Sequence, residues 1–479
     1  MHLSGSVSRR EFLKLAGVAG ATVGLGAGLG GLLAACGSST ETTTTTSAAG
    51  SETTTTAAGG TSTTAAATSM TVASAPEGRP IKIGVVSPLT GTLASFAKPD
   101  KWIVDTVAAS VKDGVVCGDG KLHKFEFKIV DSQSRADRAA QVAGDLILND
   151  KVDIVLASSN PDTVNPVADQ CEANGVPMLA NFVPYETFFF GRKGTPAKPF
   201  KWTYMSHYGY ADSARLRSET WKQIPTNNKV GLILPNDTSG RAFASETNGV
   251  PFYMKDLGYT FINPGFHETN AEDFTQQIFA FKKDGCEILT GAQQPPAFTN
   301  FWKQVLQQGY QPKIVTMSLA LLFHETAVAL GDIVQGLSTE VVWHPTFPYK
   351  SSLTGQTCQE LADQYSKDTG NGWTEPIGQY GKFEWAIDVC KRTKDLDNKE
   401  EYVAAIQSTK LNTINGLIDF TAPVKLGTRH PVLNVNIISI ASGQWFKTQG
   451  GPWPYEIKLV AATDSTIPTT AKIQPLVYS

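Results

Sequence analysis

Short apolar stretches alternate with segments of helical periodicity from about residue 80 onward. The clearest example is the segment 151–181, in which VDIVLA and VPMLA enclose SSNPDTVNPVADQCEANG. Both apolar runs are as short as buried strands and the first is rich in β-branched residues, whereas the segment between them has apolar residues at helical spacing. We therefore predict a strand–helix–strand unit whose two strands pair in parallel through a right-handed crossover.

The turn between the first of these strands and its helix is a candidate binding site. It contains Ser158, Ser159, Asn160, Asp162 and Thr163. Open parallel sheets bind ligands beyond the carboxyl ends of their strands, and the free backbone N–H groups of a helix N-terminus suit an anion such as a carboxylate. The same residue types are ordinary helix caps, so capping alone also explains them.

The same rhythm of strands and helices occurs on both sides of this unit. Before it, the pattern predicts strands at 81–86 and 124–130 and helices at 98–112 and 136–149. After it, we expect strands at 229–234, 259–263, 286–290 and 314–317, and helices at 212–221, 240–256, 273–283 and 298–308. Helices at 358–368 and 379–391 follow, and then strands at 417–420 and 432–440 as a closing hairpin or sheet edge. Such alternation indicates parallel α/β sheets, and its repetition indicates two similar lobes.

The N-terminal part of the chain has a different character. The run SRREFLK at 8–14 has the form of a twin-arginine export signal, and a Gly/Ala-rich apolar stretch follows it up to LAACG at 33–37. We predict a removable signal peptide over 1–35, with Cys36 as the acylated residue of a bacterial lipobox that anchors the protein on a membrane face. Residues 36–78 are mostly Thr, Ser, Ala and Gly, as in a tether that builds no packed core.

Composition and motifs narrow the possible functions. The formal net charge is −3, which gives no indication of a nucleic-acid partner. The sequence contains no Gly-x-Ser-x-Gly elbow, no His-Glu-x-x-His helix and no phosphate-binding glycine loop, so we predict no catalytic residue, metal or cofactor. Besides Cys36 the sequence contains five cysteines, an odd number, so at least one stays free or pairs outside the chain. A bridge between Cys358 and Cys390 is possible in an oxidising compartment, but spacing does not decide it.

Several segments together resemble a known family. They are IKIG at 81–84, PLTG at 88–91, DSQS at 131–134, 155–163, GVP at 175–177, 286–291, GY at 309–310, ALGDIVQG at 329–336 and GQY at 378–380. In this order they resemble the leucine/isoleucine/valine-binding proteins, the extracytoplasmic receptors of branched-chain amino-acid-type ABC importers. The resemblance implies a type I periplasmic binding protein with two doubly wound parallel-sheet lobes, joined by a multi-strand hinge and closing on a ligand. We expect lobe 1 at 79–203 and 340–415, and lobe 2 at 204–339 and 416–475.

The resemblance also implies where a ligand lies. The ligand-binding positions that we expect, partly from it and partly from their place at strand ends and lobe crossings, are Phe96, Asn160, Asp162, Thr163, Phe182, Tyr185, Tyr208, Ser239 and Gln293. Two positions depart from amino-acid-binding members of the family. Pro161 stands where such members have a serine, and Leu319 stands where they have an acidic residue.

These departures affect the choice of ligand. A ligand carboxylate buried beside Asp162 would be repelled, and an ammonium without an anionic partner would be costly to bury. Asp162 could itself accept the ammonium from the opposite lobe. An ordinary aliphatic amino acid is therefore less expected than in a typical member, while amides, aromatic compounds and other small polar molecules stay open.

We accordingly expect an extracytoplasmic, lipid-anchored and monomeric solute-binding protein of an ABC importer. It would capture a small polar or amino-acid-like molecule between its lobes and deliver it unchanged to permease and ATPase subunits. One alternative is a ligand-sensing receptor of the same fold. A less favoured one is a secreted, membrane-anchored hydrolase without short motifs.

Overall fold

The computed structural model describes residues 75–422, 424, 432–451 and 453–478. The chain divides into two units, Met1–Ala67 and Thr68–Ser479, and everything described below belongs to the second. The predicted signal peptide, Cys36 and most of the predicted tether lie outside the described residues. Within the described part, no helix combines the length and the apolar character that crossing a membrane requires.

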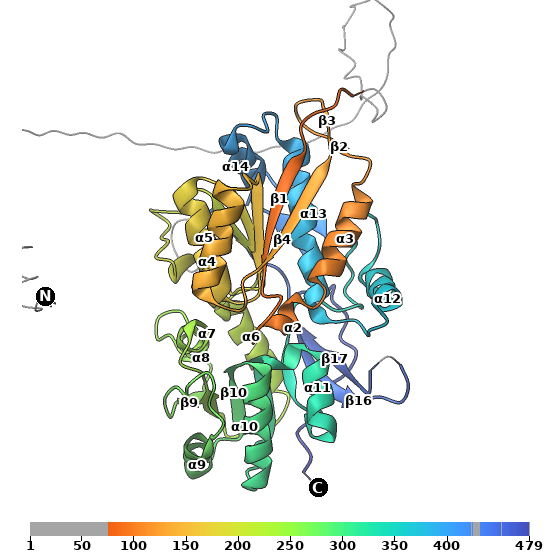
Figure 1. The fold of residues 1–479 in the computed structure, drawn as a ribbon. Helices are drawn as coiled ribbons and strands as arrows, with labels where there is room; N and C mark the ends of the chain where they lie inside the picture. The colour runs from red at the N-terminus through yellow and green to blue at the C-terminus, as the bar shows by residue number, and fades with distance from the viewer. Residues whose placement is uncertain (1–74, 423, 425–431, 452, 479) are drawn as a thin grey trace, which may run out of the picture. The chain divides into compact units, whose positions relative to one another are not determined.

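Two large sheets organise this unit (Figure 1). The six strands of the first sheet are all parallel, in the spatial order β15 (Val435–Asn436), β7 (Thr203–Ser206), β6 (Met178–Asn181), β5 (Ile154–Ser158), β1 (Ile81–Ser87) and β4 (Phe125–Asp131). The seven strands of the second are β17 (Tyr455–Ala462), β16 (Ala441–Lys447), β12 (Ser338–Val341), β11 (Ile314–Leu319), β10 (Ile288–Gln293), β8 (Lys229–Ile233) and β9 (Thr260–Ile262). In the second sheet the strands from β9 to β12 are parallel, and β16 and β17 continue it antiparallel.

Helices accompany each sheet, and we call each sheet with its helices a lobe. In the first lobe they are α2 (Ala94–Ala97), α3 (Asp100–Ser110), α4 (Ala136–Leu148), α5 (Pro161–Asn174), the π-turn η2 (Glu186–Phe190), α12 (Cys358–Thr369), η5 (Glu375–Gln379), α13 (Tyr380–Arg392) and α14 (Lys399–Gln407). In the second they are α6 (Tyr210–Trp221), α7 (Thr238–Phe243), α8 (Val250–Met254), α9 (Thr275–Asp284), α10 (Pro295–Gln307), η3 (Ala320–Leu322), α11 (His324–Leu330) and η4 (Gly331–Val334). Two hairpins complete the described elements: β2 (Val115–Val116) with β3 (Leu122–His123), and β13 (Lys410–Thr413) with β14 (Gly416–Asp419).

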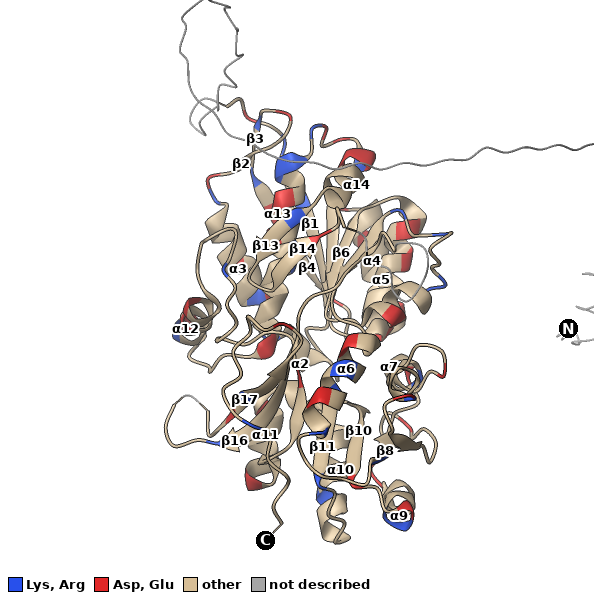
Figure 2. Cartoon of the chain, turned by 180° about the vertical axis from the view of Figure 1, so that it is seen from behind, with Lys and Arg blue, Asp and Glu red and all other residues tan. Residues whose placement is uncertain are grey.

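The first sheet is covered on both faces. Figure 1 shows α4 and α5 on one side of β1 and α3 and α13 on the other. Its strands are mostly apolar because both faces are buried, as in parallel sheets generally. The view from behind in Figure 2 shows that charged residues lie mainly on helices and loops, whereas the strands are largely uncharged.

The predicted central unit is confirmed. It consists of β5, α5 and β6, and β5 pairs with β6 in parallel, with Val155 opposite Met178 and Ser158 opposite Asn181. Asn160 is the N-cap of α5, and Gly175 ends the helix in the left-handed conformation, with φ of 68°. The two doubly wound lobes predicted as the fold class are confirmed as well.

Two local predictions were wrong in their bounds. The single helix expected at 240–256 is two short helices, α7 and α8, because Gly249 and Pro251 start a new helix. The strand expected at 432–440 is only β15. Of the two arrangements expected for it, a closing hairpin or a sheet edge, the sheet edge is confirmed, because β15 pairs in parallel with β7 at the edge of the first sheet. Asn434 fixes this position by donating from its side-chain amide to the carbonyls of Phe200 and Thr203, both at 2.9 Å.

Two further outcomes concern the lobes and the cysteines. The lobe boundaries stay a prediction, although β15, which lies inside 416–475, belongs to the first sheet. The chain passes to the second sheet after β7, returns after β12, and passes again after β15. Among the described residues all five cysteines are buried and free, so the bridge considered between Cys358 and Cys390 is not formed.

Candidate ligand-binding site

A cavity of about 40 Å³ lies where the carboxyl ends of strands from both sheets meet. Residues that end or directly follow β5, β6, β7, β11 and β12 line it, and so do residues of α2 and α7. Its lining is Phe96, Ser159, Asn160, Pro161, Phe182, Pro184, His207, Tyr208, Tyr210, Ser239, Phe243, Ala292, Ser318, Leu319, Leu322, Glu340 and Val342. Carboxyl ends are where open α/β sheets bind ligands, so we call this the cleft cavity and treat it as the candidate site.

The cleft cavity is small in this conformation. Pockets for small molecules usually measure about 300–1,000 Å³, whereas one water molecule occupies about 30 Å³ of liquid. Next to it lies a wider hollow of about 480 Å³, which we call the vestibule, and Asn160 lines both. A ligand therefore requires the lobes or the lining side chains to move as it enters.

The structure brings together five of the nine predicted ligand-binding residues. Phe96, Asn160, Phe182, Tyr208 and Ser239 line the cleft cavity.

The other four predicted residues do not line this cavity. Asp162 lines the vestibule, where Thr238 of the second lobe donates a hydrogen bond to its carboxylate. The hydroxyl of Thr163 is 2.7 Å from that of Ser159, so it takes part in the hydrogen bonding at the start of α5. Tyr185 is buried against Gly209, and the amide of Gln293 is 2.6 Å from the Nε2 of His267. For Thr163, Tyr185 and Gln293 the contacts thus indicate packing rather than ligand contact.

Three of the eight described non-glycine residues with positive φ line this cavity. They are Ser159 at 147°, Phe182 at 59° and Leu319 at 67°. They follow or end β5, β6 and β11. Such conformations cost about 1–3 kcal/mol each and persist where the surroundings impose them, often at functional sites.

A buried ion pair borders the cavity in the second lobe. Arg217 of α6 and Glu340 of β12 are in contact, with side chains only 1% and 3% exposed. Ser213 and Ser318 also donate to Glu340, at 2.6 and 2.9 Å, and the guanidinium of Arg217 donates further to Ser318 at 2.8 Å and to Thr290 at 3.2 Å. Burial opposes ionisation of Glu340, but the charge of Arg217 and these hydrogen bonds outweigh it and lower the pKa of Glu340.

Aromatic rings from both lobes form much of the remaining wall. Phe182 stacks on His207 with ring centroids 5.4 Å apart, and Phe96 meets Phe323 edge-on at 5.0 Å. Burial lowers the pKa of His207 to about 3, so its imidazole is neutral at physiological pH. The Nδ1 of His207 and the Oγ of Ser239 are buried without a hydrogen-bond partner among the described residues.

The start of α5 differs from the expected anion site. Its first residue, Pro161, has no backbone N–H, and the next N–H, of Asp162, donates to the side chain of Asn160 at 3.1 Å. The N–H of Thr163 donates to the Asn160 carbonyl at 3.3 Å. The N–H groups of Asp162 and Thr163 are thus already bonded, whereas those of Ser159 and Asn160, just before the helix, donate to no acceptor among the described residues. Anion binding at this turn stays a prediction.

A buried polar network supports the first-lobe side of the cavity. The ammonium of Lys382 donates to the Ser158 hydroxyl at 2.7 Å and to the Gln379 side chain at 2.8 Å, and Gln379 in turn donates to the carbonyl of Phe96 at 2.7 Å. Burial lowers the pKa of Lys382 to about 8, although nearby Asp100 opposes this. The network ties α13 and η5 to α2, which carries Phe96, and to the end of β5, directly before Ser159.

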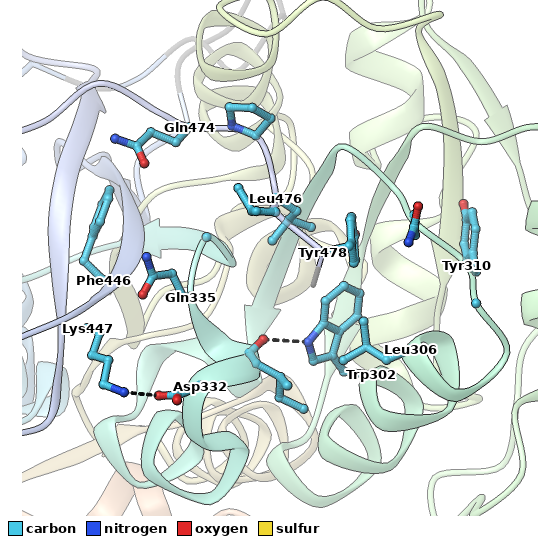
Figure 3. A pocket seen from close by; sticks show the side chains of 16 residues that line it. Trp302, Leu306, Tyr310, Asp332, Gln335, Phe446, Lys447, Gln474, Leu476 and Tyr478 are labelled. Carbon is cyan, nitrogen blue, oxygen red and sulfur yellow. Dashed lines mark hydrogen bonds and ion pairs between the residues drawn. The ribbon is translucent and has the colours of Figure 1, made fainter.

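A larger cavity of about 510 Å³ lies elsewhere in the second lobe (Figure 3). It is bordered by α10, η4, the end of β16 and the C-terminal segment, with Trp302 donating to the carbonyl of Ile333 at 2.8 Å. Gly309, Tyr310 and Gly336 line it and precede β11 and β12, so it lies at the amino ends of the parallel strands. Ligand sites of such sheets lie at the opposite ends, so we favour the cleft cavity.

Several residues of the cleft cavity were not predicted from the sequence. They are His207, Tyr210, Phe243, Ser318 and Glu340. One signal was available for Ser318 and His207, which lie at or just beyond strand ends. Within the described residues, no group of three or more His, Cys, Asp or Glu side chains is placed to hold a metal ion.

Two parallel α/β lobes with a cavity at their facing carboxyl ends define the class of type I periplasmic binding proteins. The model of the periplasmic binding protein family matches residues 80–444, and the chain belongs to this family of solute-binding proteins. A twin-arginine translocation pathway signal matches residues 6–26, which confirms the predicted export signal and indicates a location outside the cytoplasm.

Solved structures show the same fold. The leucine-binding protein LivK of Thermotoga maritima is 17% identical with a TM-score of 0.64, and the match covers 80% of this chain and 99% of that one. The branched-chain amino acid transporter substrate-binding protein LivJ of Streptococcus pneumoniae, in complex with isoleucine, is 13% identical with a TM-score of 0.62, covering 79% and 99%. A solute-binding protein of an ABC transporter from Rhodopseudomonas palustris, in complex with 3,4-dihydroxybenzoic acid, is 17% identical with a TM-score of 0.63, covering 81% and 98%.

Proposed function

We propose that this protein is the lipid-anchored receptor of an ABC importer, which binds one small solute in the cleft cavity and delivers it unchanged to a permease. The observation that carries the proposal is the cavity itself. It lies at the carboxyl ends of both sheets and contains three strained backbone positions, Ser159, Phe182 and Leu319. Membership of the periplasmic binding protein family supports the same role.

Closure of the two lobes would trap the solute. Among the contacts that join the lobes near the cavity are the ion pair of Lys98 with Glu325 and the hydrogen bond from Thr238 to Asp162. Both would break when the lobes open on a hinge and form again on closing. The three passages of the chain between the sheets, after β7, β12 and β15, are where such a hinge would bend.

A thermal-shift screen of the purified segment 78–479 against a broad panel of small metabolites tests this function. Because a ligand that binds only the folded protein raises its apparent stability, Tm should rise with the concentration of a true ligand. Ser239→Phe fills the cleft cavity and should abolish the shift, whereas Thr247→Phe adds the same ring at an exposed position and should keep it. A screen without any ligand, or shifts that Ser239→Phe leaves intact, would refute a solute receptor of this kind.

The lipid anchor is tested separately. Wild-type protein should sediment with membranes after cell lysis, and Cys36→Ser should appear in the soluble extracytoplasmic fraction. Equal membrane association of the two proteins would show that Cys36 is not the anchor.

A further inference from the structure

The charged residues around the candidate site share one sign. Glu340 lines the cleft cavity, and Asp162, Asp237 and Glu272 line the vestibule. Among the described residues that line these two spaces, none is a lysine or an arginine. Arg241 borders a neighbouring hollow next to Asp162, but its guanidinium donates to the side chain of Asn236.

Two buried cations lie beside the cleft cavity, Arg217 and Lys382, and both already donate to neighbouring groups. The guanidinium of Arg217 donates to Glu340, Ser213, Ser318 and Thr290. The first three residues of α5 offer no free N–H to an anion, because Pro161 has none and the next two are bonded to Asn160. A ligand carboxylate would therefore meet negative charge without a cationic side chain in the lining to offset it, which is costly in a partly desolvated site.

A positive charge meets the opposite situation. Carboxylates of both lobes, Asp162 on α5 and Asp237 before α7, line the same vestibule. Burial and the charge of Asp162 raise the pKa of Asp237 to about 6, against the hydrogen bond from Gly240. A cation placed between these two groups would relieve their mutual repulsion.

The cavity wall suits the rest of such a ligand. Phe96, Phe182, Tyr208, Tyr210 and Phe243 present aromatic rings, which attract cations through their faces and cover apolar groups. The unpartnered Oγ of Ser239 and Nδ1 of His207 can both accept hydrogen bonds, and an ammonium group has only donors to give.

We infer that the cleft takes a small, positively charged amine without a carboxylate, with its apolar body among the aromatic rings and its ammonium toward Asp162 and Asp237. This inference rests on the proposed solute-binding function and names the chemical class of the solute. Leu319, which lines the cavity, stands where amino-acid-binding members of the resembled family have an acidic residue. The negative groups come from the vestibule instead.

Matched probes that differ by one charged group test the inference. With the segment 78–479, 2-phenylethylamine should raise Tm in a concentration-dependent way, whereas 3-phenylpropionate and phenylalanine should not. Of the aliphatic pair, 3-methylbutylamine should raise Tm and leucine should not. Titration calorimetry then measures Kd for each amine that shifts Tm.

Charge-removing variants locate the binding. Asp162→Asn keeps the acceptor for Thr238 and should weaken amine binding on the order of fivefold, as for one charge pair near 4 Å in an aqueous dielectric. The matched control is Asp363→Asn, an exposed aspartate of α12 that lines neither space, and it should leave Kd unchanged. Added salt should weaken amine binding to the wild type more than to Asp162→Asn.

The outcomes separate this inference from the function on which it rests. If leucine, phenylalanine or 3-phenylpropionate binds at least as tightly as its matched amine, and Ser239→Phe abolishes that binding, the receptor function stands and the cationic class is wrong. If neither amine binds while another compound of the broad panel does, the inference is overturned as well. If nothing in either panel binds, the receptor function itself fails.

Discussion

The buried pair of Arg217 and Glu340 provides the sharpest test of the energetics at this site. Glu340→Gln removes the negative charge but keeps the size of the side chain and one acceptor oxygen. The guanidinium of Arg217, whose side chain is 1% exposed, would then remain charged in the protein interior with only Ser213, Ser318 and Thr290 as partners. Breaking one half of a buried pair costs about 3–5 kcal/mol, a large share of a typical stability of about 5–15 kcal/mol.

Urea unfolding of four proteins measures this cost: the wild type, Glu340→Gln, Arg217→Met and the double variant. We expect each single variant to lose about 3–5 kcal/mol, and the double variant to lose clearly less than the sum, because it leaves no unpaired charge. Asp332→Asn is the control, because Asp332 pairs with Lys447 at 2.7 Å on the surface and should lose less than about 1 kcal/mol. If each single variant lost less than about 1 kcal/mol of stability, as the control does, and the double variant lost their sum, the buried pair would be refuted.

The same pair predicts a pH dependence. The pKa of Glu340 is lowered in the folded protein, so its contribution is complete above the pKa of an unfolded glutamate, about 4.3. The contribution is lost as the pH falls through the folded pKa. The stability difference between wild type and Glu340→Gln should therefore be constant near neutral pH and shrink below about pH 4. A difference that grows in acid would contradict the assignment.

Three further predictions concern closure, a second buried acid and the thiols. Lys98→Ala removes the ion pair with Glu325 that joins the lobes. Calorimetry should show ligand binding weakened by about two- to fivefold, with a smaller effect at high salt. An unchanged Kd at low salt would exclude this closing contact. Burial raises the pKa of Glu186 to about 8, so the stability of the wild type should fall as the pH rises from about 4.5 through 8. The urea midpoint of Glu186→Gln should fall less over that range. Equal pH dependence of the two midpoints would be evidence against the raised pKa. The described cysteines are Cys117, Cys171, Cys286, Cys358 and Cys390, and all are buried. They should react with a thiol reagent only after unfolding, and prompt reaction of the native protein would contradict their burial.

The sequence predicted elements best where one local pattern decides them. The unit β5–α5–β6 was placed almost to the residue, because buried parallel strands are continuous apolar runs and Asn160 and Gly175 bound the helix. The antiparallel edge formed by β16 and β17 was missed. β16 reads ASGQWFK, whose small and polar residues give no clear alternation even though most of them are buried.

The site was predicted only in part, for a related reason. Phe96, Asn160, Phe182, Tyr208 and Ser239 line the cleft cavity. They were expected at a common site from the family resemblance together with their place at strand ends and lobe crossings. Asp162 was expected in the same place, but it is turned toward the vestibule and Thr238 of the other lobe. Which side of a helix start faces a cavity depends on how the second lobe packs against it.

The sequence by itself determined the export signal, the alternation of strands and helices, and the two-lobe fold, because each of these is written in local periodicity or in a contiguous motif. Only the tertiary structure decided the electrostatic character of the cleft. Arg217 and Glu340 are 123 residues apart and neutralise each other, and acids from two lobes meet in one vestibule. The electrostatic potential at a site is the sum over charges weighted by their distances, and those distances are set by folding and cannot be read from the sequence.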